Sequence, residues 1–554
     1  MRAACEEARA TGNKLAVVQW INIGEELQNW LQICYAGITS QLLINGNVGA
    51  KFDVRRSVRQ GCPISPTLFA LYLEPLCRHI IEDETIQGTK VAQEEIKLLA
   101  FADDAAIICT EVTHVERALE IIRHFCEVSG ATLNLDKTKG CWLGEWAKKP
   151  ENLLGIEWTT ELDTYLGVKL DPEVWHPGIW KQKLNQLQGK LQPFMGRQLS
   201  ILHRSVIINT ALYPAILYCA QAIPVDGGTV QQFHRLCARY LWQSKFERMR
   251  RSNIFWSLEA GGLGVVNLEI KIKVQRFLYF RDQRRPEIRA AMQVMGTSHL
   301  LEWIVTTTQT TALDKTTLTF YREMKLSIRF FLEILTWEYL ATVKKKKLYW
   351  DTVAMMYPPP LYRQNFTEIS PRDVLKRIKY LPIPTSSKDF FVKFHIEVLP
   401  AKHWLQGKGF LVPWEGRCDM CGETETLRHV VYECRNAFLF WSDLRTSLQI
   451  EEELPYEALK FLNFKRKEFT EVKSVAVVTG LQALWKARTS RVECDAKPRS
   501  PIHFLKIKLM WTLSLIGTRR LREKKRWKDL ADTIQQLSPK TFGCRRRNTC
   551  KEKE

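Results

Sequence analysis

Two adjacent aspartates, Asp103 and Asp104, are the residues whose type and spacing most directly indicate chemistry. They lie between the apolar runs Leu98–Phe101 and Ala105–Cys109, whose lengths and composition are typical of strands. Because Asp favours tight turns, the sequence predicts a hairpin with both carboxylates at its tip. Two ionised carboxylates about 4 Å apart repel by roughly 4 kcal/mol at an effective dielectric constant near 20. A Mg²⁺ ion, which binds carboxylates together with substrate phosphates, would remove that cost. The alternative is a pair of solvated turn residues.

A loop rich in glycine, proline and arginine, Arg55–Pro66, precedes this hairpin. Gly61 permits a backbone conformation that other residues resist, and it lets a ligand approach closely. Ser65 and Pro66 are expected to be the N-cap and first residue of a helix that continues through Ile80. A loop of this kind beside arginines suits a strand of nucleic acid or a nucleotide. An ordinary loop at a helix start is the alternative.

Composition indicates the kind of partner and the compartment. Among 554 residues, 81 Lys and Arg exceed 60 Asp and Glu, so the net charge is +21. This charge favours a polyanionic partner, with nucleic acid ahead of an anionic membrane. No apolar run approaches the ~20 residues of a membrane span and the opening residues do not resemble a secretion signal, so we expect no membrane partner. The 15 cysteines are scattered and odd in number. They fit a reducing, intracellular compartment, nuclear or cytoplasmic, rather than a disulfide framework.

A second candidate metal site lies in the spacing Cys418-x₂-Cys421-x₇-His429-x₄-Cys434. Four nitrogen and sulfur ligands at such short spacing fit a closed, tetrahedral zinc site of the Cys₃His type, which contributes folding free energy. The alternative is three buried cysteines and a surface histidine. Basic and aromatic neighbours indicate that this region contacts nucleic acid: Lys402, His403, Trp404, Lys408, Arg417 and Arg428.

Other basic segments accompany helical patterns in the second half of the chain. Aromatic residues that could stack on bases interleave with arginines that could neutralise phosphates: Trp242, Phe246, Phe255 and Trp256 with Arg248, Arg250 and Arg251. The alternative for each ring is core packing beside a solvated basic face. Lys344–Lys347 and Pro358–Pro360 indicate a linker or an exposed edge. The basic tail from Thr518 onward suits nucleic-acid contact or nuclear import, or is solvated and disordered.

Four motifs together resemble a known family. They are Arg59-Gln60-Gly61-x-Pro63-x-Ser65-Pro66, Phe101-Ala102-Asp103-Asp104, Asn134-Leu135-Asp136-Lys137-Thr138 and Tyr165-Leu166-Gly167. Each motif alone is a weak pattern, but in this order and at these spacings they resemble the palm of reverse transcriptases from non-LTR (long interspersed element) retrotransposons. The resemblance continues through Gly261–Gly264 and into the Cys/His cluster, so it covers most of the chain from about Lys14 onward.

The resemblance implies a role for each matching residue. Asp103 and Asp104 would be catalytic ligands of a two-Mg²⁺ site, and Lys137 would protonate the leaving pyrophosphate. The nucleotide and template would contact a group around the glycine-proline loop: Arg59, Gln60, Gly61, Pro63, Ser65 and Phe101. Tyr165 and Gly167 would lie in the turn that grips the primer end. The implied partners are an RNA template and a DNA primer or target, and the Cys₃His cluster would be the family's zinc knuckle.

The chain departs from the family pattern at one catalytic position. A two-metal polymerase needs a further aspartate on an earlier strand, facing Asp103. The strand Leu15–Val18 is followed by Gln19–Asn22, and Asp53 is the only aspartate before Gly61. We therefore expect an incomplete metal site that polymerises poorly or not at all, from a decayed element or an incomplete sequence of an intact one. The endonuclease and most of the fingers of the family are likewise not expected in this chain.

The expected fold is α+β, with a truncated right-hand palm, a helical thumb and a mainly helical C-terminal region around the zinc knuckle. The expected divisions are an incomplete palm at 1–175, a thumb at 176–300, a linker or helical region at 301–400, the knuckle region at 401–445, and a basic helical region with its tail at 446–554. The expected function is RNA-directed DNA polymerase of a non-LTR retrotransposon, inactive or weak in this form. A non-catalytic nucleic-acid-binding remnant of such an element is the alternative.

Overall fold

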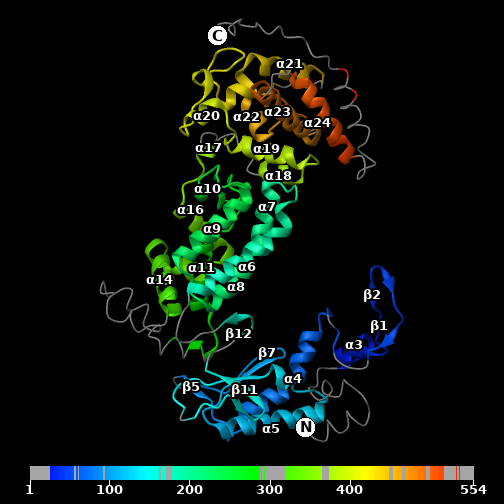
Figure 1. Cartoon of the computed structure of the whole chain (residues 1–554), viewed down its shortest axis with the longest axis vertical. Helices are drawn as coiled ribbons and strands as arrows, with labels where there is room; N and C mark the ends of the chain where they lie inside the picture. The colour runs from blue at the N-terminus through cyan, green and yellow to red at the C-terminus, as the bar shows by residue number, and fades with distance from the viewer. Residues whose placement is uncertain are drawn as a thin grey trace, which may run out of the picture. The chain divides into compact units, whose positions relative to one another are not determined.

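The computed structural model divides the chain into two compact units (Figure 1). The first unit comprises Met1–His176 and Tyr279–Arg329, and the second comprises Pro177–Leu278 and Phe330–Glu554. The structure describes residues 25–516, with 532 and 536, apart from gaps at 55–57, 60, 92–93, 147, 161–163, 170–176, 287, 290–291, 293–318, 365–373, 448–452, 465–469 and 494–498. The segment 14–22, Gln60 and nearly all of the basic tail therefore lie outside the described residues. The five-part division expected from the sequence stays a prediction.

The first unit combines helices with short strand pairs. Its first 176 residues contain α3 (Glu25–Tyr35), α4 (Ser65–Glu82), α5 (Val112–Ser129) and the 3₁₀ turn η1 (Leu135–Lys137). The strands are β1 (Thr39–Ser40), β2 (Leu43–Ile44), β3 (Asn47–Val48), β4 (Phe52–Asp53), β5 (Thr89–Val91), β6 (Glu94–Ile96), β7 (Leu98–Phe101), β8 (Asp104–Ile107), β9 (Lys139–Cys141), β10 (Asn152–Leu153), β11 (Ile156–Thr159), β12 (Thr164–Tyr165) and β13 (Val168–Lys169). All described pairs are antiparallel except β9 with β11, which is parallel.

An apolar core fixes the base of the β7–β8 hairpin. Ile80 of α4 and Ile121 of α5 are buried in one cluster, and Leu98 and Ile107 pack against it. Leu98 and Ile107 are paired across the two strands at the end away from the turn. An isolated two-stranded hairpin is marginally stable in water, so packing against helices is what makes this one stable. The core thereby positions the residues at the opposite end of the strands.

The described part of the second unit is helical apart from an isolated bridge between Arg417 and Thr424. Its helices are α6 (Pro177–Met195), α7 (Ile201–Ile207), the π-helix η2 (Ile208–Leu212), α8 (Tyr213–Ala222), α9 (Gly227–Trp242), α10 (Arg251–Ile254), α11 (Leu268–Asp282), α15 (Trp337–Thr342), α16 (Lys345–Met356), α17 (Leu361–Gln364), α18 (Val374–Tyr380), α19 (Thr385–His395), α20 (Lys402–Gln406), η3 (Pro413–Gly416), the π-helix η4 (His429–Glu433), α21 (Arg435–Ser447), α22 (Tyr456–Phe461), α23 (Thr470–Glu493) and α24 (Pro501–Ile516). The residues of α11 and those of α14 (Thr319–Ile334) are each divided between the two units.

A half-buried carboxylate joins two helices of the second unit that are far apart in the sequence. Asp389 of α19 accepts a hydrogen bond from the Ile201 backbone N–H at 2.6 Å, at the start of α7. Its other oxygen lies 3.2 Å from the Arg204 guanidinium. A carboxylate at a helix N-terminus satisfies a free N–H group and interacts favourably with the helix dipole.

The sequence predicts that no apolar run approaches the length of a membrane span, and the stretch Ile201–Ala222 is an exception to that prediction. This helical stretch is 22 residues long, with a mean hydropathy of 1.2, and by length and composition alone it could cross a membrane. Buried core helices of soluble proteins pass the same test. Here the stretch contains Arg204, which is paired with Asp389 of α19.

Gly140 in β9 gives a test of the packing in the first unit. A Cβ atom at this position would lie 2.1 Å from Cδ2 of Trp158, whose ring stacks at 4.3 Å on the buried Trp142. Gly140→Ala should therefore lower the free energy of unfolding of this unit by roughly 1–3 kcal/mol, as overpacking typically does. The measurement is urea unfolding followed by tryptophan fluorescence.

The control for this test is Gly189→Ala. Gly189 is in α6, where an added Cβ would have no heavy atom within 4 Å. This substitution should leave stability unchanged or raise it slightly, because alanine restricts the unfolded chain. An unfolding curve for Gly140→Ala that coincides with that of the unsubstituted protein would contradict the packing described here.

Candidate metal centres and nucleic-acid contacts

The structure confirms a hairpin with the two aspartates at its tip. Phe101 of β7 is paired with Asp104 of β8, so Ala102 and Asp103 form the turn. Ala102 has φ 53°, a left-handed conformation that only a few per cent of residues other than glycine adopt. Such conformations cost free energy and cluster at functional sites. Both carboxylates are exposed.

The two carboxylates have the chemistry of a Mg²⁺ site. Neither forms a hydrogen bond or an ion pair with another residue in the described part of the chain. Their oxygens are therefore free to bind a hard cation, and Mg²⁺ commonly binds one or two carboxylates plus substrate phosphates. Asp103 and Asp104 fit that donor set. A bridged pair of metal ions would need a further acidic ligand.

Tyr165 is near Asp104. Burial raises the pKa of the Tyr165 phenol, and the negative charge of Asp104 raises it further. Tyr165 ends β12, and the turn to β13 has φ 49° at Leu166 and φ 74° at Gly167. Two positive φ angles are what a two-residue hairpin turn of the primed type requires. The structure therefore brings the Tyr165 turn and the aspartate tip into electrostatic contact, and the role in primer binding stays a prediction.

The loop before α4 is organised by the Ser65 hydroxyl, although Ser65 is not the N-cap that the sequence predicts. The helix begins at Ser65, after Ile64, and has no side-chain cap. The hydroxyl instead donates to the Arg59 carbonyl at 2.6 Å and lies 2.7 Å from the Tyr35 hydroxyl. These bonds use the hydroxyl to close the loop and attach it to α3. Gly61 within this loop has φ 85°, a conformation that favours glycine.

The remaining predicted contact residues are accessible but not joined to the aspartates. Phe101 is 66% exposed, and Arg59, Pro63 and Lys137 are also exposed. The Asn134 side chain accepts a hydrogen bond from the Lys137 backbone N–H at 3.2 Å, which stabilises the turn η1. No hydrogen bond or ion pair among the described residues links these side chains to the carboxylates. Their roles stay predictions.

Asp53 belongs to another strand pair than the two aspartates of the hairpin. It ends β4, which pairs with β1, and Asp53 is opposite Thr39. In the described residues β7 pairs with β8 alone, so Asp53 lies on a different sheet from the aspartate hairpin. The further aspartate is expected after the strand Leu15–Val18, and the segment 14–22 is outside the described residues.

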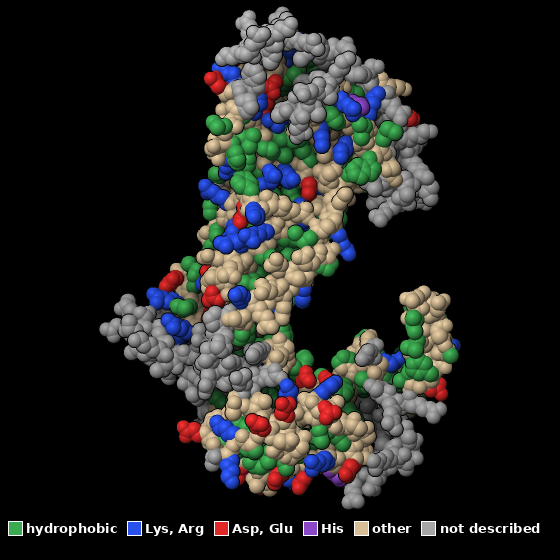
Figure 2. All heavy atoms as spheres, viewed as in Figure 1, with side chains coloured by type: hydrophobic (Ala, Val, Ile, Leu, Met, Phe, Trp, Pro, Cys, Tyr) green, Lys and Arg blue, Asp and Glu red, His purple; other side chains and the backbone are tan. Residues whose placement is uncertain are grey.

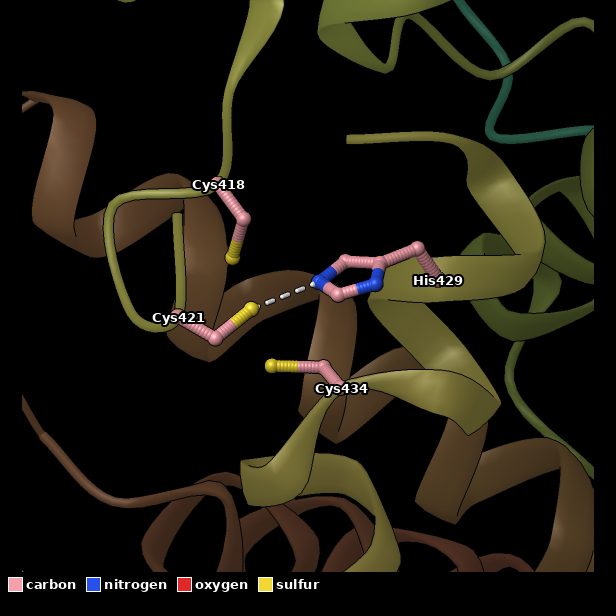
Figure 3. A group of neighbouring side chains, drawn as sticks. All are labelled: Cys418, Cys421, His429 and Cys434. Carbon is pink, nitrogen blue, oxygen red and sulfur yellow. Dashed lines mark hydrogen bonds between the residues drawn. The ribbon is translucent and has the colours of Figure 1, made fainter. Parts of the chain in front are cut away.

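The four predicted zinc ligands converge (Figure 3). The ligand atoms of Cys418, Cys421, His429 and Cys434 all lie within 4.8 Å of one another, and all but Cys421 are buried. The Cys421 sulfur is 3.1 Å from Nε2 of His429. Bonds of about 2.3 Å to sulfur and 2.0 Å to nitrogen place tetrahedral zinc ligands at this mutual separation. A hollow of about 470 Å³ beside Cys421 is lined in part by Glu433 and Arg435.

Local hydrogen bonds shape this cluster, which we call the knuckle and define as residues 417–434. The Cys418 N–H donates to the Glu423 carbonyl at 2.7 Å, across a turn in which Gly422 has φ 82°. The Thr426 hydroxyl accepts from the His429 N–H at 3.0 Å, at the start of the π-helix η4. Short π-helical turns are frequent at functional sites.

The thiols of the knuckle are electrostatically coupled. A hydrogen bond from the Cys434 thiol lowers the pKa of Cys418 to about 4. The same contact raises the pKa of Cys434. One sulfur is therefore anionic near neutral pH, and the thiolate is the form that binds a metal ion.

Glu425 attaches the knuckle to the helices around it, and the sequence analysis did not identify it. Its side chain is buried, accepts from the Lys402 N–H of α20 at 3.1 Å, and accepts from Nε of Arg488 in α23 at 3.0 Å. The only available signal was a glutamate between two ligands, and such a residue is usually solvated. Its partner Arg488 is too distant in sequence to be paired with it by pattern.

The aromatic residues predicted to interleave with arginines separate into two groups. Trp242 and Phe255 are buried, so core packing is the correct interpretation for these two rings. The Trp256 indole donates to the Pro358 carbonyl at 3.2 Å. Phe246 is 45% exposed and Trp256 is half-buried, so these two rings remain at the surface.

Comparison with known proteins is consistent with this geometry. Residues 15–170 match the family "Reverse transcriptase (RNA-dependent DNA polymerase)". The matched residues include the aspartate hairpin, the loop before α4 and the Tyr165 turn. One relative is the "Transposon TX1 uncharacterized 149 kDa protein" of Xenopus laevis, which is 26% identical over 48% of this chain and 21% of the relative. A second is the "Retrovirus-related Pol polyprotein from type-1 retrotransposable element R2" of Popillia japonica, which is 23% identical over 47% of this chain and 44% of the relative.

A third relative is the "Retrovirus-related Pol polyprotein from type-2 retrotransposable element R2DM" of Drosophila melanogaster, 23% identical over 43% of this chain and 24% of the relative. The chain thus spans less than half the length of each of these relatives. The resemblance predicted from the four motifs is confirmed at the level of the family. Residues 15–170 are a reverse transcriptase domain, and the chain is a distant relative of the polyproteins of non-LTR retrotransposons.

Proposed function

We propose that this chain is the RNA-directed DNA polymerase region of a non-LTR retrotransposon, with impaired catalysis in the form given by its sequence. The observation that supports polymerase chemistry is the pair of exposed carboxylates at the tip of the β7–β8 hairpin, within the matched region. Among the described residues neither carboxylate has a hydrogen-bond or ion-pair partner. The reaction is in-line attack of a primer 3′-hydroxyl on the α-phosphate of a nucleoside triphosphate.

In this proposal each residue acts on a stated group. Asp103 and Asp104 bind Mg²⁺, which when present neutralises charge on the reacting phosphates. Lys137 donates a proton to the leaving pyrophosphate, and the Tyr165 turn positions the primer end beside Asp104. The nucleotide and template lie along the loop that Ser65 closes. The missing aspartate after Leu15–Val18 removes electrostatic stabilisation that is commonly worth several kcal/mol, so catalysis is weak or absent.

The second candidate function is nucleic-acid binding without polymerisation. The knuckle and the basic surfaces of the second unit do not depend on the acidic ligand that the sequence lacks. A net charge of +21 favours binding of a phosphate backbone in either case. The knuckle would then be the structural zinc site of a binding module for RNA or DNA.

Primer extension distinguishes the two functions. The full chain should bind a primed RNA template but add no or very few deoxynucleotides in Mg²⁺, because the metal site has two of three acidic ligands. Any incorporation that disappears in Asp103→Asn supports a residual polymerase. Retained binding without incorporation supports the binding module, and efficient incorporation by both proteins contradicts the assigned role of Asp103.

Zinc content tests the knuckle. The purified chain should contain about one zinc ion by elemental analysis, because the four ligands form one tetrahedral donor set. Cys434→Ser should lose the ion and lower the thermal stability of the second unit. The matched control is Cys219→Ser, a buried cysteine of α8 outside the knuckle, which should keep its zinc. Full zinc occupancy in Cys434→Ser would refute the site.

Glu425→Gln tests the attachment of the knuckle to α23. The substitution removes the negative charge that faces Arg488 and leaves this partly buried guanidinium without its charged partner. Losing a hydrogen bond to a charged group commonly costs about 1.5–3 kcal/mol. Chemical unfolding of the second unit should show a loss of this order. Glu423→Gln, an exposed neighbour in the same segment, should change stability by less than about 0.5 kcal/mol, and equal effects of both substitutions would contradict a special role for Glu425.

A further inference from the structure

Two segments that are far apart in the sequence meet on one surface of the second unit. The loop 243–250, between α9 and α10, contains Phe246, and α20 contains Trp404. Their ring centroids are 6.4 Å apart at an interplanar angle of 86°, an edge-to-face contact. Each segment alone was a candidate nucleic-acid contact in the sequence. The structure joins them, while it buries Trp242 and Phe255 in the core.

The two rings remain accessible to a ligand. Phe246 is 45% exposed, and Trp404 is half-buried with the Lys408 ammonium 5.7 Å above its ring. The chain that follows exposes Phe410 and Leu411.

The two segments also carry cations that form no ion pair with a carboxylate of the described residues. Lys245, Arg248 and Arg250 lie in the loop of Phe246, and Lys408 lies beyond α20. Figure 2 shows Lys and Arg side chains gathered over the part of the second unit where Figure 1 labels α9 and α10. Two acidic groups nearby are paired, Glu247 with Arg251 at 2.8 Å and Asp419 with Lys402 at 2.6 Å.

The knuckle holds α20 in place. The Lys402 ammonium donates to the Arg417 carbonyl at 2.8 Å, and the His403 N–H donates to the Glu425 carbonyl at 3.1 Å. These two bonds attach the first residues of α20 to the backbone of the knuckle, at Arg417 and at Glu425. Trp404 is therefore presented on a fixed helix, which lowers the entropic cost of binding.

We infer that this ring-pair surface, defined as Lys245, Phe246, Arg248, Trp404 and Lys408, binds a single-stranded segment of RNA or DNA. Unpaired bases stack on Phe246 and Trp404, and phosphates face the three cations. A duplex keeps its base faces covered, so ring stacking selects a single strand over a duplex. The inference rests on the proposed nucleic-acid function and states which surface carries it.

Fluorescence anisotropy of the full chain with labelled oligonucleotides tests this surface. The probes are one single-stranded RNA, the DNA of the same sequence, and the duplex of each. Trp404→Ala and Phe246→Ala should each weaken single-strand binding by roughly tenfold and change duplex binding little, since base stacking on one ring is worth this much. Trp404→Phe, which keeps a flat ring, should restore most of the affinity.

The matched control is Trp511→Ala. Trp511 in α24 is 48% exposed and has the Lys508 ammonium 5.1 Å above its ring, so it repeats the local chemistry of Trp404 outside the ring-pair surface. This control should bind as the unsubstituted chain does. Far-UV circular dichroism and zinc content check folding, and if Trp404→Ala does not fold, Phe246→Ala on the exposed loop decides.

The outcomes separate this inference from the proposed function. If the chain binds single strands and both ring variants bind equally well, the ring-pair surface is wrong and nucleic-acid binding stands. Equal losses on duplex and single strand also overturn it. If the unsubstituted chain binds none of the oligonucleotides, both the inference and the proposed function fail. Loss of affinity for RNA alone, DNA alone or both supports the surface and identifies the strand it takes.

Discussion

Apolar packing at one end of a hairpin determines where two charges are placed at the other. Leu98 and Ile107 pack against the core of α4 and α5, and this contact fixes the direction of both strands. Full burial of such a side chain contributes about 1.5–3 kcal/mol, and Leu98 and Ile107, which are partly buried, each contribute a fraction of it. This contribution acts against the repulsion between Asp103 and Asp104. The candidate metal site of the first unit therefore depends on side chains that never contact a metal ion or a substrate.

Buried charges have the corresponding role in the second unit, where they connect segments remote in sequence. Asp389 joins α19 to the start of α7, and Glu425 joins the knuckle to α20 and α23. Buried ion pairs add little net stability, because the charges lose their hydration on folding. Each of these ion pairs nevertheless disfavours any helix packing that separates the two charges, because a charge left without its partner costs free energy. The helices of this unit are consequently held in one arrangement by a few polar contacts within a large apolar core.

Local patterns predicted the parts of the site that are built from neighbouring residues. The aspartate hairpin follows from strand-like runs on either side of two turn residues, and the knuckle follows from ligand spacing. Contacts between distant segments were not predictable in this way. The residues next to Ser65 predict an N-cap. The structure instead uses its hydroxyl to bind the Arg59 carbonyl and Tyr35, and the sequence near Ser65 does not indicate the contact with Tyr35. Whether Trp242 or Phe246 faces solvent likewise depends on which helices pack around each ring.

The position of Glu425 has a consequence for the energetics of the whole helical unit. A ligand that binds only the folded state raises the free energy of unfolding with the logarithm of its free concentration, by about 1.4 kcal/mol for each tenfold increase above the dissociation constant. A zinc ion held by the four knuckle ligands would act in this way. Through Glu425 and Arg488 the effect would extend to α23. The concentration of free zinc in the cell would then set how firmly α23, which supplies none of the four ligands, is held against the knuckle.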